Sequence, residues 1–120
     1  MDAANLDTMP NKRKDILLIE THIIDISDLC PVSHNPQPKS TIVIQYIPNN
    51  VFLEVYSLTA FINSFKGGRV YKDVFVRDME QVIQIVFDAV RTTLDTTHVK
   101  ITATLKLDVH TMKLELGSLE

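Results

Sequence analysis

One short stretch of the chain combines a nucleophile with a stiff backbone. Cys30 is the only cysteine among the 120 residues, and three prolines follow it within eight positions. A residue before proline favours extended geometry, so the segment 30–38 is predicted to be a rigid loop that holds the thiol in one place. His34 could transfer protons to or from that thiol if the loop folds back. A buried, inert cysteine is the alternative interpretation.

Other familiar catalytic patterns are missing from the sequence. The four histidines are scattered and form no H-x-x-x-H pair, so no metal site is predicted. There is no G-x-G-x-x-G and no P-loop motif, and Gly67-Gly68 is interpreted as a helix stop.

The segment Lys66–Arg77 carries a local surplus of positive charge. Its cations are Lys66, Arg69, Lys72 and Arg77 against Asp73 alone, with Tyr71 and Phe75 interleaved. Phosphate contacts and base stacking are what RNA recognition requires, and solvated loop charge is the alternative. The net charge of −3 argues against a protein that coats nucleic acid without specificity.

Glu54 allows two interpretations. It stands where the first predicted helix begins, so its carboxylate could simply complement the helix dipole. A carboxylate is also a natural bidentate partner for the adjacent donors on a purine-like edge.

Hydrophobic periodicity predicts four strands and two helices. Strict alternation indicates strands at 98–108 and 111–116, which read as an antiparallel hairpin, and earlier strands at 16–26 and 40–47. Val55, Leu58, Ile62 and Phe65 predict a helix that ends at Gly67-Gly68. A stronger apolar stripe predicts a second helix that ends before the cluster Thr92–Thr97; it comprises Met79, Val82, Ile83, Val86, Phe87 and Val90.

This order predicts an α+β domain of ββααββ topology, a four-stranded antiparallel sheet with two helices on one face. Residues 1–15 are expected to be a flexible N-terminal arm, 16–116 the single domain, and 117–120 a tail of the kind that cloning can add. Without a signal-peptide pattern or an apolar run of roughly 20 residues, a cytoplasmic protein with no membrane contact is expected.

The segment Leu29–Gly68 resembles the nitrile reductases of queuosine biosynthesis, the QueF family. The shared features are the Cys-Pro loop, a strand that ends in Tyr-Ile-Pro, and a glutamate that opens a helix containing Ser-Phe. The resemblance implies a tunnelling fold (T-fold) that assembles into ring-shaped homo-oligomers, here expected as a decamer of two pentameric rings, with active sites between subunits. It also implies that Cys30 attacks the nitrile of 7-cyano-7-deazaguanine to form a thioimide.

The chain departs from the reductase pattern at the cofactor motif. That motif has the form E-[SL]-K-[SA]-x-K-[LY], whereas this chain reads EVYSLTAF, with Tyr56 and Thr59 at the lysine positions. Because those lysines suit a phosphorylated nicotinamide, the resemblance implies that the NADPH site is lost and that no cofactor is used.

Two further departures concern the substrate. A His-Glu pair that grips the base in the family falls, by counting, on Lys72 and Asp73. The acid seven residues after the cysteine falls on Gln37, which cannot donate a proton as an acid. His34, Asp28 or water would then deliver the proton.

A chain that keeps the thiol and the purine grip but loses the hydride donor resembles the QueF-like archaeal branch. The resemblance therefore implies an amidinotransferase that adds ammonia to 7-cyano-7-deazaguanine in tRNA and yields archaeosine. Its partners would be that tRNA, ammonia and further copies of the chain. The implied residues are Cys30 and His34 for catalysis, Glu54, Asp73, Lys72 and Gln37 for the substrate, and Lys66, Arg69 and Arg77 for tRNA.

Two alternatives stay open. One is an NADPH-dependent reductase of the free base, which the missing lysines disfavour. The other is a catalytically silent T-fold protein that binds a purine or pterin, or merely assembles, and Gln37 is its best support.

Overall fold

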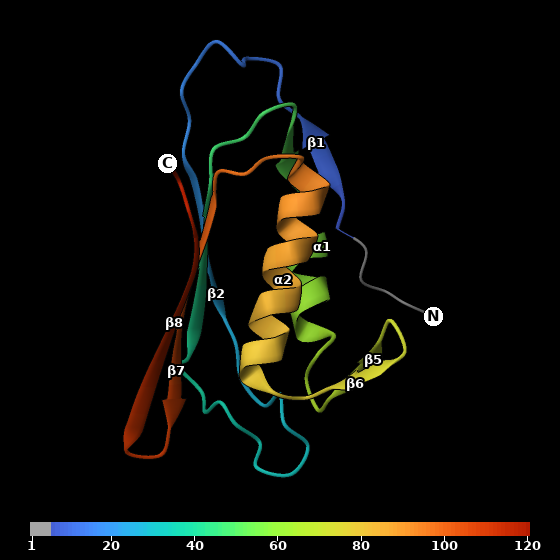
Figure 1. Ribbon diagram of the computed structural model, residues 1–120, viewed down its shortest axis with the longest axis vertical. Helices are drawn as coiled ribbons and strands as arrows, with labels where there is room; N and C mark the ends of the chain where they lie inside the picture. Colours follow the sequence, from blue (N-terminus) through green and yellow to red (C-terminus); the bar gives the residue numbers. More distant parts are fainter. Residues whose placement is uncertain (1–5) are drawn as a thin grey trace.

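The fold is built on one antiparallel sheet. The computed structural model describes residues 6–120 of the chain. The sheet has the order β2-β3-β7-β8, formed by Glu20–Asp25, Thr41–Tyr46, Val99–Leu107 and His110–Ser118. Figure 1 shows α1 (Val55–Asn63) and α2 (Met79–Leu94) on the same side of this sheet. The predicted α+β class, with a four-stranded antiparallel sheet and two helices, is confirmed.

The order of elements is longer than ββααββ. Two short antiparallel pairs accompany the main sheet in the described part of the chain: β1 (Thr8–Pro10) with β4 (Val51–Leu53), and β5 (Arg69–Tyr71) with β6 (Val74–Val76). Each strand has only three residues, too few for a period-2 pattern to be recognised in the sequence.

The alternation read from the sequence decides which side chains form the core. On β3, Ile42, Ile44 and Tyr46 are fully buried, and on β7 so are the alternate residues from Val99 to Leu105. These side chains point at the helices, whose buried residues include Leu58, Ile62, Val82 and Val86. Val55 was predicted to be part of the first apolar helical stripe. It is 54% exposed, because it is the first residue of α1 and does not pack into the hydrophobic core.

The second helix is longer than predicted. It continues through Thr92 to Leu94, and Asp95 then adopts a left-handed conformation at the C-cap, with φ 50°. Leu94 is 1% exposed, so its burial extends the helix past the β-branched threonines that the sequence marks as a stop.

The strand predicted over 16–26 begins four residues later. Glu20 pairs with Tyr46, where β3 ends, so the described structure offers no partner strand to residues 16–19. Ile16, Leu17 and Ile19 are consequently more than half exposed.

Both chain ends are more involved in the fold than expected. The predicted arm, 1–15, includes β1, whose Thr8 and Pro10 pair with Leu53 and Val51; its residues 1–5 lie outside the described part. The predicted tail, 117–120, begins within β8, where Gly117 pairs with Lys100. Polar composition suggested a detached arm and tail, but strand pairing uses backbone groups and does not require apolar side chains.

Candidate active site

The cysteine loop, residues 28–37, folds back on itself. The backbone N–H groups of Leu29 and Cys30 both donate to the carbonyl oxygen of Asn35, at 2.9 and 3.1 Å. His34 N–H donates to the carbonyl oxygen of Cys30 at 2.9 Å. These bonds close the loop around Cys30, a folding back that the sequence analysis left open.

Both ends of the cysteine loop are attached to the rest of the fold. Gly67, in the turn after α1, donates its N–H to the carbonyl oxygen of Asp28 at 2.8 Å, and Gln37 N–H donates to Lys106 on β7 at 2.8 Å. Gly67 adopts φ 74°, a conformation that glycine reaches without steric cost. The loop is therefore held between the end of α1 and the central sheet.

The thiol of Cys30 is partly accessible and activated. Ser33 N–H donates to Sγ at 3.5 Å. The pKa of Cys30 is lowered to about 7, first by the hydrogen bond from the Ser33 hydroxyl, then by the N–H groups of Ser33 and Val32, with a smaller contribution from the charge of Arg77. Cys30 is half-buried rather than buried, and the lowered pKa favours the thiolate, which is the nucleophilic form of a cysteine.

His34 is paired with Asp28 in the same loop. Its Nδ1 lies 2.7 Å from Oδ1 of Asp28, and the two side chains are 70% and 54% exposed. Both residues have positive φ, 61° and 54°, which turns the backbone so that their side chains meet. The two alternative proton carriers named from the sequence thus form one hydrogen-bonded pair within the loop that carries Cys30.

Gln37 contributes its backbone to the loop while its side chain is exposed. Its carbonyl oxygen accepts the Ser40 hydroxyl at 2.7 Å. A neutral amide at this position offers hydrogen bonds but no ionisable proton.

Glu54 caps α1. Its carboxylate accepts the N–H groups of Tyr56 and Ser57 at 2.8 and 2.7 Å, and these bonds hold the pKa of Glu54 below its ordinary value. The helix-terminus interpretation of this residue is confirmed. The nine residues of α1 span about 14 Å, so within one copy of the chain Glu54 lies a full helix length from the turn that touches the cysteine loop.

Lys72 and Asp73 form the tip of the β5-β6 hairpin. Both have positive φ, 48° and 68°, as the two central residues of a tight hairpin turn require. Lys72 Nζ lies 5.5 Å from the ring centroid of Tyr71, and both tip residues are exposed.

The remaining basic residues have different surroundings. Arg69 donates to the hydroxyl of Ser64 at 2.6 Å and lies 5.1 Å from the ring centroids of both Phe65 and Tyr71, so its guanidinium is built into the protein. Lys66 is exposed in the turn after α1, next to Gly67. The charge of Arg77 makes a small contribution to the lowered pKa of Cys30.

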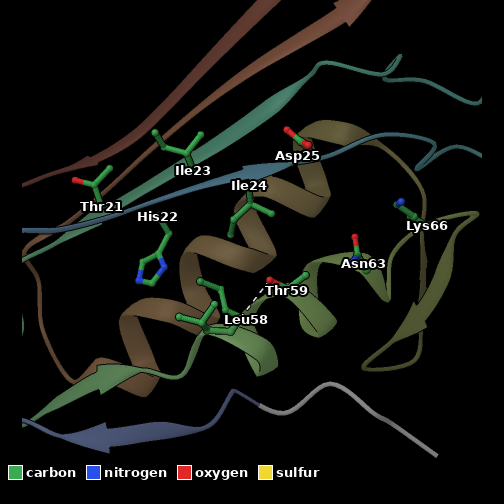
Figure 2. Close-up of a pocket in the computed structure, with 10 residues that line it drawn as sticks. Thr21, His22, Ile23, Ile24, Asp25, Leu58, Thr59, Asn63 and Lys66 are labelled. Atoms are coloured by element: carbon green, nitrogen blue, oxygen red, sulfur yellow. Dashed lines mark hydrogen bonds between the residues drawn. The ribbon is translucent and has the colours of Figure 1, made fainter.

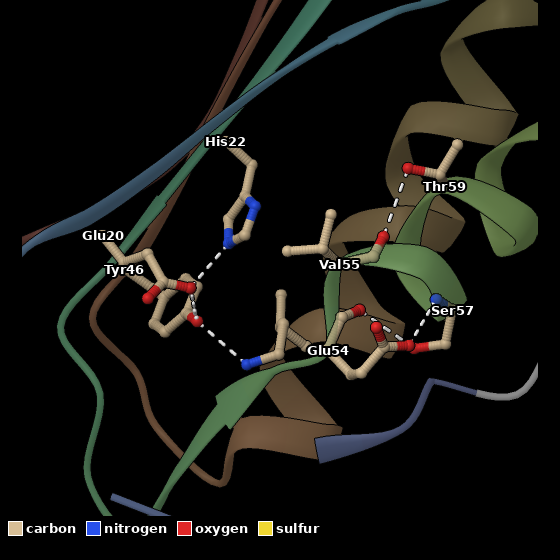
Figure 3. Close-up of polar contacts among 8 residues, drawn as sticks. Glu20, His22, Tyr46, Glu54, Val55, Ser57 and Thr59 are labelled. Carbon is tan, nitrogen blue, oxygen red and sulfur yellow. Dashed lines mark hydrogen bonds and ion pairs between the residues drawn. The ribbon is translucent and has the colours of Figure 1, made fainter. Parts of the chain in front are cut away.

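A polar cluster that the sequence analysis missed joins β2 to β3. Oε1 of Glu20 accepts a hydrogen bond from the Tyr46 hydroxyl and lies 2.7 Å from Nε2 of His22, while the Tyr46 hydroxyl accepts the N–H of Leu53 at 2.9 Å (Figure 3). Burial raises the pKa of Tyr46 above its ordinary value. The signal in the sequence was two ionisable residues, Glu20 and His22, at core-facing positions of a predicted strand.

Neither a metal site nor a membrane-spanning helix is found in the part of the chain that the structure describes. No cluster of three or more histidine, cysteine, aspartate or glutamate side chains there could ligate a metal ion. No described helix is long and apolar enough to cross a membrane.

The sequence is similar to bacterial NADPH-dependent 7-cyano-7-deazaguanine reductases. It is 34% identical over 73 residues to that of Zymomonas mobilis, covering 60% of this chain and 49% of the relative. It is 29% identical over 86 residues to that of Caulobacter vibrioides, covering 70% and 56%. The chain thus spans about half the length of these curated relatives, and no protein-family model matches it.

The fold is also that of a solved structure. The apo crystal structure of the archaeosine synthase QueF-Like matches 85% of this chain and 94% of its own, with a TM-score of 0.65 and 14% sequence identity. The resemblance to the QueF family inferred from the sequence is therefore found in both comparisons, and the fold is QueF-like.

Proposed function

We propose that this chain converts 7-cyano-7-deazaguanine in tRNA to archaeosine, through a thioimide formed on Cys30. The observation that carries the proposal is the activated, partly accessible thiol in a rigid loop, with a pKa of about 7. The substrate class is taken from the sequence similarity of this chain to enzymes that are named for 7-cyano-7-deazaguanine.

The first step joins sulfur to carbon. The Cys30 thiolate attacks the electrophilic nitrile carbon, one C–N π bond becomes a nitrogen lone pair, and that nitrogen takes up a proton. His34, oriented by Asp28, is the residue of this loop best suited to supply the proton, because Gln37 has none to give.

The second step replaces sulfur by nitrogen. Ammonia adds to the thioimide carbon, the tetrahedral intermediate transfers a proton, and the C–S bond breaks to release the Cys30 thiolate and an amidine. The sum is one nitrile plus one ammonia giving one amidine, without oxidation or reduction. A hydride donor is therefore unnecessary, in agreement with Tyr56 and Thr59 at the positions where the reductase motif has lysines.

The substrate pocket is completed, in this proposal, by a second copy of the chain. Glu54 and Cys30 lie at opposite ends of α1 in one copy, so a base gripped by Glu54 would be attacked by the cysteine of a neighbour. Within residues 6–120, β2 and β8 are the edge strands of the main sheet, and their outer edges are available to pair with further strands. A ring of such copies, doubled into a decamer, would repeat this pocket at each subunit boundary.

The tRNA backbone would lie along the basic residues near the cysteine loop. Lys66 and Arg77 are exposed, and they flank the loop from the α1 and β6 sides. Arg69 is engaged with Ser64, Phe65 and Tyr71 and would act chiefly by holding the hairpin that carries Lys72 and Asp73.

A reductase of the free base is the second candidate, because the curated relatives named above are NADPH-dependent reductases. The two candidates predict different co-substrates. Ammonium-dependent conversion of tRNA that carries the nitrile, read by nucleoside mass spectrometry, would support the amidinotransferase. Oxidation of NADPH on addition of the free base would support the reductase.

The intact mass of the protein tests the shared chemistry. Incubation with 7-cyano-7-deazaguanine, as free base and within tRNA, should add the mass of the ligand to the wild-type chain and nothing to Cys30→Ala. Ser27→Ala, a small substitution just before the loop, is the matched control and should form the adduct. Absence of an adduct on the wild-type chain with either ligand would leave a catalytically silent binding protein as the better description.

A further inference from the structure

A groove lies between the edge strand β2 and helix α1. Its volume is about 560 Å³, and its lining includes His22, Ile24, Leu58, Thr59, Asn63 and Lys66. Figure 2 shows His22 and Ile24 pointing from β2 toward α1, whereas Thr21, Ile23 and Asp25 point to the other side of the strand. One wall therefore carries an imidazole, and the other carries hydroxyl, amide and ammonium groups.

The imidazole of His22 is held in a defined orientation. Its ring stacks on Tyr46, with centroids 6.0 Å apart and planes 11° apart, and its Nε2 faces a carboxylate oxygen that already accepts the Tyr46 hydroxyl. Nε2 must then carry the proton, because two acceptors would repel at 2.7 Å. In its neutral form the ring then presents an accepting lone pair on Nδ1, and no residue among 6–120 donates to that atom.

The α1 side of the groove carries unused polar groups. The Thr59 hydroxyl donates to the carbonyl oxygen of Val55 at 3.2 Å, so its oxygen can still accept. The side chains of Asn63 and Lys66 are exposed and have no hydrogen-bond or ion-pair partner among residues 6–120. A cation at one end and an accepting nitrogen at the other suit a ligand with both an anionic group and a hydroxyl.

We infer that this groove binds ribonucleotide backbone, with a phosphate on Lys66 and a ribose 2′-hydroxyl donating to Nδ1 of His22. The three steps from His22 to Asp25 advance about 10 Å along β2, which leaves room for a nucleotide and its neighbouring phosphate. The 2′-hydroxyl is the group that distinguishes RNA from DNA. That the groove binds RNA is argued from its own residues. Only the assignment of that RNA as tRNA rests on the proposed function.

The position of the groove fits an RNA that also reaches Cys30. At its Lys66 end the groove adjoins Gly67, whose N–H is bonded to Asp28 of the cysteine loop. Beyond Lys66 the chain continues into the basic segment that ends at Arg77. A nucleotide in the groove would therefore flank the base that reacts with the thiol.

A second copy of the chain is a less suitable occupant. The centres of protein interfaces are depleted in lysine, whereas this groove combines the apolar Ile24 and Leu58 with Lys66, Asn63 and the imidazole of His22. A neighbouring strand paired with β2 would use the backbone edge of that strand, and His22 would still point down toward α1. The groove would then lie at a boundary between copies.

Binding of unmodified RNA tests the inference without any nitrile chemistry. The assembled protein is titrated into fluorescent single-stranded hexauridine and its deoxy counterpart, and anisotropy is followed at several salt concentrations. Lys66→Gln should weaken both ligands and lower the slope of log affinity against log salt by about 0.7, the value for one phosphate contact in a single strand. His22→Gln should weaken RNA by about tenfold and leave DNA unchanged.

Matched controls are available on exposed positions away from the groove. Lys113→Gln on β8 and His110→Gln at the β7-β8 turn should leave both affinities unchanged. Asn63→Asp keeps the His22 cluster intact and places a negative charge in the groove, so it should weaken RNA even if His22→Gln proves unstable. The inference is overturned if Asn63→Asp and Lys66→Gln bind RNA as the wild type does. It is also overturned if these substitutions change the oligomeric state in sedimentation, which would assign the groove to a second copy.

Discussion

The backbone N–H of Gly67 donates to the carbonyl oxygen of Asp28 over 2.8 Å, and this bond fastens the turn after α1 to the loop that carries Cys30. Three features consequently meet in one place: the Cys30 loop, the Asp28–His34 pair and the beginning of the basic segment. The bond also fixes Glu54, at the other end of α1, away from the thiol of the same copy.

The reactivity of Cys30 should follow a titration near neutral pH. With a pKa of about 7, alkylation by iodoacetamide should accelerate from pH 6 to pH 8 and level off above it, because the thiolate is the reacting form. Ser33→Ala should move the midpoint upward, and Arg77→Gln should move it less, since the hydroxyl contributes more than the distant charge. A midpoint that Ser33→Ala leaves in place would contradict this account of the activation.

Substitution of His34 should reduce turnover strongly and should affect the alkylation of the Cys30 thiol much less. His34→Gln removes the proton carrier, so we expect the yield of amidine to fall by roughly 100-fold, the usual contribution of general acid–base catalysis. Alkylation of Cys30 should persist in this variant. Asp28→Asn can keep the left-handed conformation and should lower turnover less than His34→Gln, because an amide oxygen can still accept from Nδ1 of His34, while Cys30→Ala removes both reactions. Unchanged turnover in His34→Gln would point to water as the proton source.

Two substitutions of Glu54 separate capping from substrate binding. Glu54→Ala leaves the N–H groups of Tyr56 and Ser57 without their acceptor, so the midpoint of denaturation should fall. Glu54→Ser supplies another good cap and should restore the midpoint, yet it lacks the carboxylate needed to grip a purine edge. If Glu54 also binds substrate, only capping is rescued and nitrile adduct formation stays weak. Full activity in Glu54→Ser would confine the residue to its structural role.

The capping effect should depend on pH in a defined direction. Because the folded pKa of Glu54 lies below its ordinary value of 4.5, the ionised carboxylate stabilises the fold above that pH. The stabilisation should disappear as the pH falls through the lowered folded pKa. The difference in denaturation midpoint between the wild type and Glu54→Ala is therefore expected to be largest at neutral pH.

Gly117 should tolerate a side chain less well than Gly67. Both have positive φ, 76° and 74°, so alanine at either position costs about 1–2 kcal/mol of backbone strain. A Cβ on Gly117 would also collide with the carbonyl oxygen of Val99, whereas at Gly67 nothing lies within 4 Å. Chemical denaturation should show a larger loss for Gly117→Ala than for Gly67→Ala. Equal losses would mean that β8 can shift away from β7 without cost.

The sequence alone determined the main sheet, the two helices and the loop that carries the single cysteine. Alternation on β7 and the stripe of α2 are local consequences of burial on one face, so a single sequence reveals them. The Cys-Pro loop and its resemblance to the QueF family are equally local. Short strands such as β1 and β5 escaped detection because pairing through backbone groups leaves little trace in side-chain type.

Only the tertiary structure decided which functional groups meet. His34 was expected beside the thiol, and folding pairs it with Asp28; Glu54 and Cys30, both expected at one substrate, lie a helix length apart in a single copy. The cluster of Glu20, His22 and Tyr46 arises from strand register, which places Glu20 opposite Tyr46 across two strands distant in sequence. Register and loop closure are set by contacts between remote segments, and the spacing of residues along the chain does not encode those distances directly.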